Sequence, residues 1–174
     1  MTAAVPEKTI ILTLLRDESG TVSSTEDKDN SRLIAGDSAK DVGYHAFFGF
    51  DISSLKGTNI KDAKLTFPTG NIDGKPFSRE YGLGGLWLLH VRGEYGQLPD
   101  YDIQGTSLLG ANSIMWELPT VIDVTQEVKS ALLSPDFSIH LQFEARFSYT
   151  TNHDHWADSV SWPVVTLVVT YVEK

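Results

Sequence analysis

Two polar stretches of the sequence carry oxygen-bearing side chains, and each lies just before a predicted strand. The first covers residues 37–41 and the second covers residues 152–158. Calcium takes roughly six to eight oxygen ligands from carboxylates and carbonyls in loops. The two stretches could supply the ligands of a structural calcium ion. Neither has EF-hand spacing, so ordinary turn-forming Asp and Asn residues are an equally open interpretation. The predicted metal ligands are Asp37, Asp41, Asn152, Asp154 and Asp158.

The second polar stretch also contains two histidines, His153 and His155, on either side of Asp154. Residues two apart on an extended segment lie on the same side of it, which raises the idea of a zinc site. Such a site needs at least a third ligand and supporting contacts around it. Asp158 or His140 is the obvious third ligand, and two exposed loop histidines are the simpler interpretation.

Catalytic chemistry has little support in the sequence. Glycoside hydrolysis needs two carboxyl groups ~5–10 Å apart, which Glu117 and Glu144 would provide if their strands were neighbours. A lyase needs a Tyr, His or Lys base, and Tyr44 or His45 could serve. The chain has no cysteine and no serine nucleophile motif. We therefore expect no enzymatic activity.

Sugar binding without catalysis needs flat aromatic faces together with polar groups for the sugar hydroxyls. Tyrosine and tryptophan residues occur in several predicted loops, and polar side chains alternate along residues 138–147. Arg146 and His45 would suit a sugar that carries a carboxylate. The predicted carbohydrate-binding residues are Tyr149, Trp156, His45, Arg146, Tyr81 and Tyr95.

The composition limits the possible partners. The 174 residues include 14 Lys and Arg against 23 Asp and Glu, a formal net charge of -9 at pH 7. This field repels nucleic acid and anionic lipid, so we expect neither as a partner. The apolar runs are far shorter than the ~20 residues of a membrane helix, and residues 1–4 lack the features of a signal peptide. If the protein is secreted, we expect either that its signal has been removed or that the chain is a fragment of something larger.

Period-two alternation at residues 44–52 predicts a central strand, with Tyr44, Ala46, Phe48, Phe50 and Ile52 on its core face. One short helix is predicted within residues 120–133. In the strand at 138–147 the odd-numbered residues are expected to face the core and the even-numbered ones the solvent. Further strands are predicted at 9–15, 21–23, 31–35, 60–67, 86–92, 113–118 and 164–172. Together these elements predict one all-β domain over residues 1–174, an antiparallel β-sandwich of jelly-roll type with its core at about 9–172.

The string LIAGDSAKDVGYHAFFGFDISSL at residues 33–55, followed by IKDAKL at 60–65, carries a family resemblance. It resembles the DNRLRE domains, secreted β-sandwich modules that include carbohydrate-binding modules attached to polysaccharide lyases and the archaeal disaggregatase-related domains. Residues 90–101, 122–141 and 151–171 follow the same pattern, so the resemblance covers nearly the whole chain. It implies a fold in which the two acidic loops approach each other.

From the resemblance and the loop aromatics we expect a non-catalytic module that binds a polysaccharide, together with a structural calcium ion. It would act outside the cell or at its surface, joined to other domains of a larger secreted protein or to copies of itself. The alternative is an extracellular structural or adhesive protein whose strand at 9–15 pairs across chains. A polysaccharide-degrading enzyme is a distant third.

Overall fold

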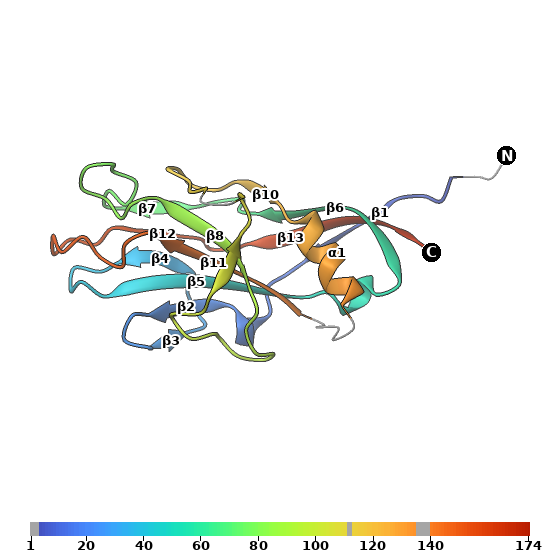
Figure 1. The fold of residues 1–174 in the computed structure, drawn as a ribbon, viewed down its shortest axis with the longest axis horizontal. Coiled ribbons are helices and arrows are strands. Elements are labelled where there is room, and N and C mark those ends of the chain that lie inside the picture. The colour runs from blue at the N-terminus through green and yellow to red at the C-terminus, as the bar shows by residue number, and fades with distance from the viewer. Residues whose placement is uncertain (1–3, 111–112, 135–139) are drawn as a thin grey trace.

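The computed structural model describes residues 4–110, 113–134 and 140–174. The chain forms two antiparallel sheets packed face to face, so the predicted all-β sandwich is confirmed. Figure 1 shows an elongated molecule in which both termini lie at one end and the long loops after β4, β7 and β11 lie at the other. We call this second region the loop end; it comprises residues 38–42, 74–85 and 148–158.

The larger sheet has the strand order β7-β12-β4-β5-β11-β8-β9, and a hairpin of β2 and β3 branches from β5. β5 and β11 lie at its centre and pair from Asp51 with His140 to Ala46 with Ala145. The strands are β2 (Gly20–Ser23), β3 (Lys28–Asp29), β4 (Ile34–Asp37), β5 (Gly43–Asp51), β7 (Asn71–Asp73), β8 (Leu86–Val91), β9 (Gly105–Ser107), β11 (His140–Phe147) and β12 (Ser159–Ser161).

The smaller sheet has the order β1-β13-β6-β10. Its strands are β1 (Lys8–Leu12), β6 (Thr58–Thr66), β10 (Val121–Asp123) and β13 (Thr166–Glu173). The single α-helix of the described residues, α1 (Thr125–Leu133), follows β10 and packs against β6, where the Thr125 hydroxyl accepts a hydrogen bond from the Ala63 N–H at 2.9 Å. Two short 3-10 turns complete the secondary structure, η1 (Arg16–Glu18) and η2 (Ser53–Leu55).

The main core lies between the two sheets and follows the predicted alternation of β5. Ala46, Phe48 and Phe50 are fully buried on the inner face of this strand. Burial of a large apolar side chain stabilises the fold by about 1.5–3 kcal/mol, so these phenylalanines anchor the sandwich. The neighbouring strand β11 adds Leu141 and Phe143, and the smaller sheet supplies facing residues that include Leu65 and Leu167.

A second, smaller core covers the outer face of the larger sheet. Residues 92–104, between β8 and β9, fold back over this face, and we call them the covering loop. Their Leu98 packs with Val22, Phe47, Leu89 and Val91 in a separate apolar cluster. This layer makes one sequence expectation wrong: Gln142 and Glu144 do face away from the main core, but they are 1% and 0% exposed instead of solvated.

Glycine permits the closest contact in this outer layer. η1 lies directly against β5 at Gly49, where a Cβ atom would come within 2.6 Å of the Glu18 Cβ. A larger residue would therefore push η1 away from the sheet. The contact places the Glu18 carboxylate, 1% exposed, beneath the covering loop.

Several predicted elements differ from the structure. The strand expected at 113–118 is absent, because only Met115 pairs there, in an isolated bridge with Leu86. Short strands β3, β7, β9, β10 and β12 occupy regions expected to be loop or helix entry, and residues 138 and 139 of the predicted strand lie outside the described residues. In the described ranges, no helix has the length and apolar character needed to cross a membrane.

Candidate functional site

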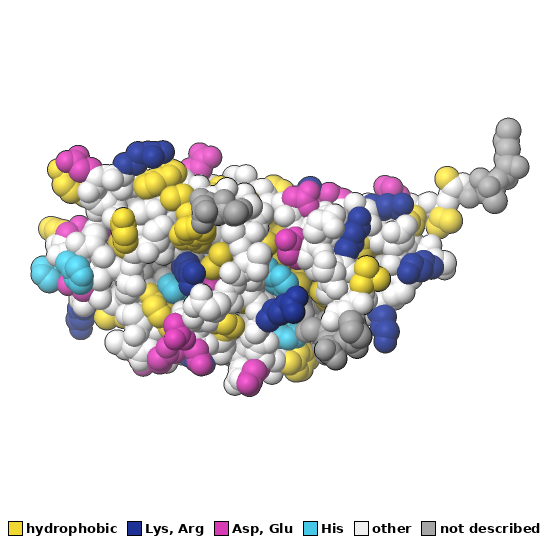
Figure 2. Space-filling model, in the orientation of Figure 1, with side chains coloured by type: hydrophobic (Ala, Val, Ile, Leu, Met, Phe, Trp, Pro, Cys, Tyr) yellow, Lys and Arg dark blue, Asp and Glu magenta, His cyan; other side chains and the backbone are white. Residues whose placement is uncertain are grey.

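A hollow of about 370 Å³ opens on the outer face of the larger sheet, beside the covering loop. Two of the predicted sugar-binding residues, His45 of β5 and Arg146 of β11, line it together. Figure 2 shows basic, acidic and histidine side chains interleaved across the middle of this side of the molecule. The hollow is lined by His45, Trp87, Tyr101, Asp102, Gln104, Arg146, Phe147, Ser148 and Thr150.

A buried carboxylate lies at the base of the hollow. Glu144 is fully buried, and its Oε1 lies 2.8 Å from the His45 Nδ1 and 3.8 Å from the Arg146 Nη1. The same His45 nitrogen lies 2.9 Å from the Tyr101 carbonyl oxygen. Both neighbours are acceptors, so this nitrogen carries a proton, and its geometry directs that proton to Tyr101. Neither Glu144 oxygen has an aligned hydrogen bond within the described residues.

Two aromatic rings form the walls of the hollow. Tyr101 stacks on His45 with 3.8 Å between ring centroids, and burial raises the pKa of its phenol. Trp87 lies directly across from Arg146 in the pairing of β8 with β11. Its indole N–H donates to the Ser148 hydroxyl at 2.9 Å, which fixes the ring plane. Both rings are half-buried, and the Arg146 side chain in the same hollow is 28% exposed.

A second histidine–carboxylate pair lies farther along the same face. His140 Nδ1 is 2.6 Å from the Glu18 Oε2, and the Gly96 N–H donates to Glu18 Oε1 at 2.7 Å. Tyr95, 60% exposed, stands edge-on to the His140 ring at 5.4 Å. Tyr95 therefore lies apart from the hollow, and this pair connects the covering loop to η1.

The three remaining predicted aromatics, Tyr81, Tyr149 and Trp156, lie at the loop end and are 62–74% exposed. Asn152 joins their loops, because its side-chain amide donates to the Tyr81 carbonyl oxygen at 2.8 Å. The Tyr149 ring packs close to Gly84. None of these three aromatics lines the hollow.

The two acidic loops meet at the loop end, as the family resemblance implied. Asp37 is 2% exposed, and its two oxygens accept the N–H groups of Asp158 and Asn152 at 3.0 and 3.4 Å. Burial, reinforced by the Asp158 charge, raises the pKa of Asp37. Asp158 accepts the Lys75 N–H on one oxygen and the Asn152 side-chain amide on the other, at 2.8 Å. These carboxylates therefore serve as acceptors that hold the two loops together.

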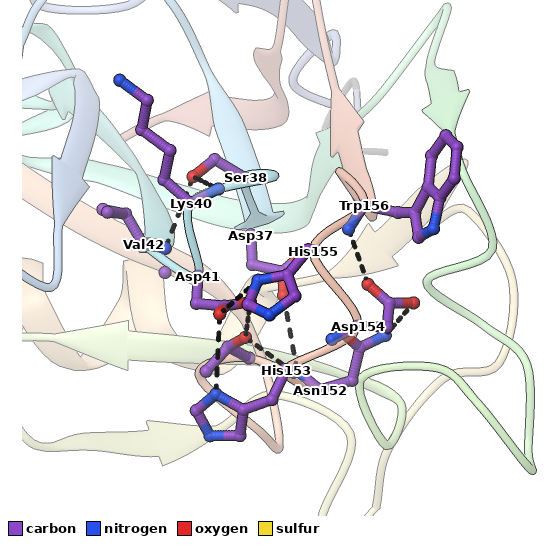
Figure 3. A network of polar contacts seen from close by, with 12 residues as sticks. Asp37, Ser38, Lys40, Asp41, Val42, Asn152, His153, Asp154, His155 and Trp156 are labelled. Carbon is purple, nitrogen blue, oxygen red and sulfur yellow. Dashed lines mark hydrogen bonds and ion pairs between the residues drawn. The ribbon is translucent and has the colours of Figure 1, made fainter.

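Asp41 belongs to the same region but has different partners (Figure 3). Its Oδ2 lies 3.0 Å from the Nδ1 of His155 and 3.9 Å from the Nδ1 of His153. Asp154 turns the other way and accepts the Trp156 N–H at 2.8 Å. As the side chains stand in the described ranges, no three His, Cys, Asp or Glu groups form a ready-made metal-binding group.

Another cavity, of about 430 Å³, lies between residues 14–34 and 161–163. Arg16 and Arg32 line it, and Arg32 pairs with Asp29 at 2.8 Å. Trp162 also lines it but is 3% exposed, so its ring face is not available to a ligand. The hollow beside Arg146 is therefore the stronger candidate site.

Seven lining residues of the hollow were not among the predicted carbohydrate-binding residues: Trp87, Tyr101, Asp102, Gln104, Phe147, Ser148 and Thr150. Trp87 could have been found, since the alternation of β8 places it on the same face as Leu89 and Val91. Tyr101 and Gln104 belong to the covering loop, whose path depends on contacts distant in the sequence. A scan against protein-family models finds no matching family, and a search of curated proteins finds no matching relative.

Proposed function

We propose that the protein is a non-catalytic carbohydrate-binding module that holds a polysaccharide in the hollow of the larger sheet. The observation that carries the proposal is that the side chains of Arg146, Trp87 and Tyr101 line one hollow. Sugars present apolar faces and hydroxyl groups together, so half-buried rings beside hydroxyl and amide groups suit them. The surrounding polar groups come from Gln104 and Thr150.

Arg146 directs the proposal toward sugars that carry a carboxylate. A guanidinium binds a carboxylate with two parallel hydrogen bonds, and the 28% exposure of this side chain leaves part of it open to a ligand. The formal charge of -9 makes a local cationic group necessary for binding a polyanion. A uronic-acid polysaccharide is therefore the preferred ligand of this proposal.

The proposal places the module outside the cell or at its surface, where polysaccharides occur, as part of a larger secreted protein or beside copies of itself. A calcium ion at the acidic loops stays a prediction of the same proposal. Asp37 and Asp158 already accept hydrogen bonds from the opposite loop, so calcium would have to compete with those donors.

Affinity electrophoresis on neutral and uronic-acid polysaccharides, run with calcium and with a chelator, tests the proposal. We expect retardation by a uronic-acid polymer. Arg146→Lys should lose most of it, because lysine keeps the charge near Glu144 but not the planar fork. Tyr95→Ala is the matched control, since that exposed ring lies away from the hollow.

Two results would contradict the proposal in different ways. Retardation that is lost in Trp156→Ala and Tyr149→Ala but kept in Arg146→Lys would move the site to the loop end. Absence of retardation on every polymer would reject carbohydrate binding. Retardation that occurs with calcium and disappears with the chelator would show that a cation takes part in the site.

One observation favours the second candidate function, a structural or adhesive protein. β1 is the outer strand of the smaller sheet, and its other edge pairs with no described strand. Ile11 on this strand is 63% exposed. An unpaired edge can accept a strand from another chain. Light scattering over a range of concentrations tests this, and a strict monomer at high concentration would count against it.

A further inference from the structure

Two imidazoles and one carboxylate from two separate loops converge at the loop end. His153 and His155 lie in the loop between β11 and β12, and Asp41 lies in the turn between β4 and β5. The Nδ1 atoms of both histidines point to the same Asp41 oxygen, Oδ2, at 3.9 and 3.0 Å (Figure 3). The nearby carboxylates of Asp37 and Asp158 accept hydrogen bonds from loop N–H and amide groups. Asp41 is therefore the carboxylate that the two histidines contact.

The separations of the two histidine nitrogens from Asp41 Oδ2 are near those between neighbouring ligand atoms of a tetrahedral metal site, although the three groups must rotate to surround one ion. Zinc–nitrogen and zinc–oxygen bonds of about 2.0–2.2 Å put neighbouring ligand atoms about 3.3 Å apart. The two measured separations lie on either side of this value. Both histidine side chains are about three-quarters exposed, 77% and 76%, so rotation of the rings can bring the three atoms around one ion.

Asp41 has the supporting contact that a metal ligand needs. Its second oxygen, Oδ1, accepts a hydrogen bond from the Thr151 hydroxyl at 3.2 Å, which leaves Oδ2 directed at the histidines. The same hydroxyl accepts the His153 N–H at 3.1 Å, so one threonine orients groups from both loops. Such outer contacts fix the orientation of metal ligands.

The backbone at this place is also unusual. Four non-glycine residues of the described chain have positive φ, and three of them are Asp41, His153 and His155, at 58°, 59° and 63°. Left-handed backbone costs energy for such residues and gathers at ligand-binding positions. The fold therefore holds all three residues in left-handed backbone.

We propose that His153, His155 and Asp41 bind a divalent cation of the zinc class, with the fourth coordination position open to water or a ligand. Imidazole nitrogens favour zinc over calcium, which prefers oxygen donors alone. The site is separate from the hollow, and it replaces the third ligands considered from the sequence, Asp158 and His140, with Asp41.

Zinc titration of the chelator-treated protein by isothermal calorimetry tests the proposal. We expect one zinc ion per chain, and a visible absorption spectrum of tetrahedral type when Co²⁺ is used instead. His153→Ala, His155→Ala and Asp41→Asn should each weaken zinc affinity by at least about tenfold, and Thr151→Val by about 10–100-fold. Asp154→Asn is the matched control and should leave zinc affinity unchanged, since it lies in the same loop but turns away from the histidines.

Two outcomes would overturn the proposal. One is the absence of zinc uptake by the wild-type protein at millimolar zinc. The other is uptake that persists unchanged in the three ligand variants, which would mark it as adventitious. Far-UV circular dichroism of each variant shows whether the sandwich is retained, and the exposure of both histidines means that their loss should not unfold it.

Discussion

The charge pair beneath the hollow gives a quantitative prediction. Glu144 is fully buried without an aligned hydrogen bond in the described residues, and Arg146 is the permanent positive charge beside it. Replacing Arg146 by Met keeps an unbranched apolar stem but removes the guanidinium and its charge. Because the carboxylate is then left buried opposite only His45, we expect Arg146→Met to destabilise the fold.

The size of the effect follows from the distance. Two unit charges 3.8 Å apart attract by about 4 kcal/mol at an effective dielectric constant of about 20. Arg146 is 28% exposed, so solvent screening reduces this attraction to about 2–3 kcal/mol. We expect Arg146→Met to lose about that much unfolding free energy. Adding Glu144→Gln to Arg146→Met should restore most of it, because the unpaired charge is removed.

Urea unfolding of the wild type, both single variants and the double variant measures the coupling directly. The reasoning predicts a coupling free energy of about 2 kcal/mol with little change in the urea dependence. A coupling below about 0.5 kcal/mol would refute it. That result would mean that Glu144 is neutral, or that water rather than Arg146 balances its charge.

Three further predictions concern single positions. Gly49→Ala should destabilise the protein by about 1–3 kcal/mol in urea unfolding, because the new Cβ would lie 2.6 Å from Glu18; an unchanged midpoint would show that η1 can shift freely. Hydrogen bonds from Thr125 lower the pKa of Asp123 to about 2. The exposed carboxylate therefore stabilises the fold above its unfolded pKa of about 3.9, and this stabilisation is lost as pH falls toward 2. Asp123→Asn should therefore lose less stability than the wild type between pH 7 and pH 3, by under about 1 kcal/mol, and an equal loss would contradict this. The pKa of Asp37 is shifted in the opposite direction, because burial raises it. Its contribution to stability is full below the unfolded pKa and is lost as pH rises through the folded pKa. Asp37→Asn should therefore remove the stability that the wild type gains from this residue on acidification, measured in the same pH series.

The residues of the main core were predictable because side-chain alternation along a strand depends only on the local sequence. Side chains on a strand alternate between faces, so the sequence around Phe48 and Phe50 indicates which residues enter the core. The same rule assigned Glu144 to the outer face correctly. It could not show that the face is covered, because alternation describes direction and not what lies above it.

The site was predictable to the extent that it depends on the sheet. His45 and Arg146 were predicted together because both suit a sugar carboxylate. They lie together because they share the outer face of two neighbouring strands, whose order the sequence does not reveal. Tyr101 reaches the hollow through the covering loop, and the stacking on His45 that holds it joins residues 56 positions apart. Contacts of this range leave no periodic signal in the sequence.

The two apolar clusters differ greatly in size, and from this difference we expect two cooperative units of unfolding. The small cluster contributes five buried residues, Val22, Phe47, Leu89, Val91 and Leu98, so the covering loop should open at a lower free energy than the sandwich unfolds. Amide hydrogens such as that of Gly96 would then exchange with solvent through local opening of the covering loop. The amide hydrogens of β5 and β11 would exchange only on global unfolding. Tyr101 and Gln104 belong to the loop and also line the hollow. A bound ligand would therefore slow exchange in the loop selectively, which makes the outer layer a reporter of occupancy.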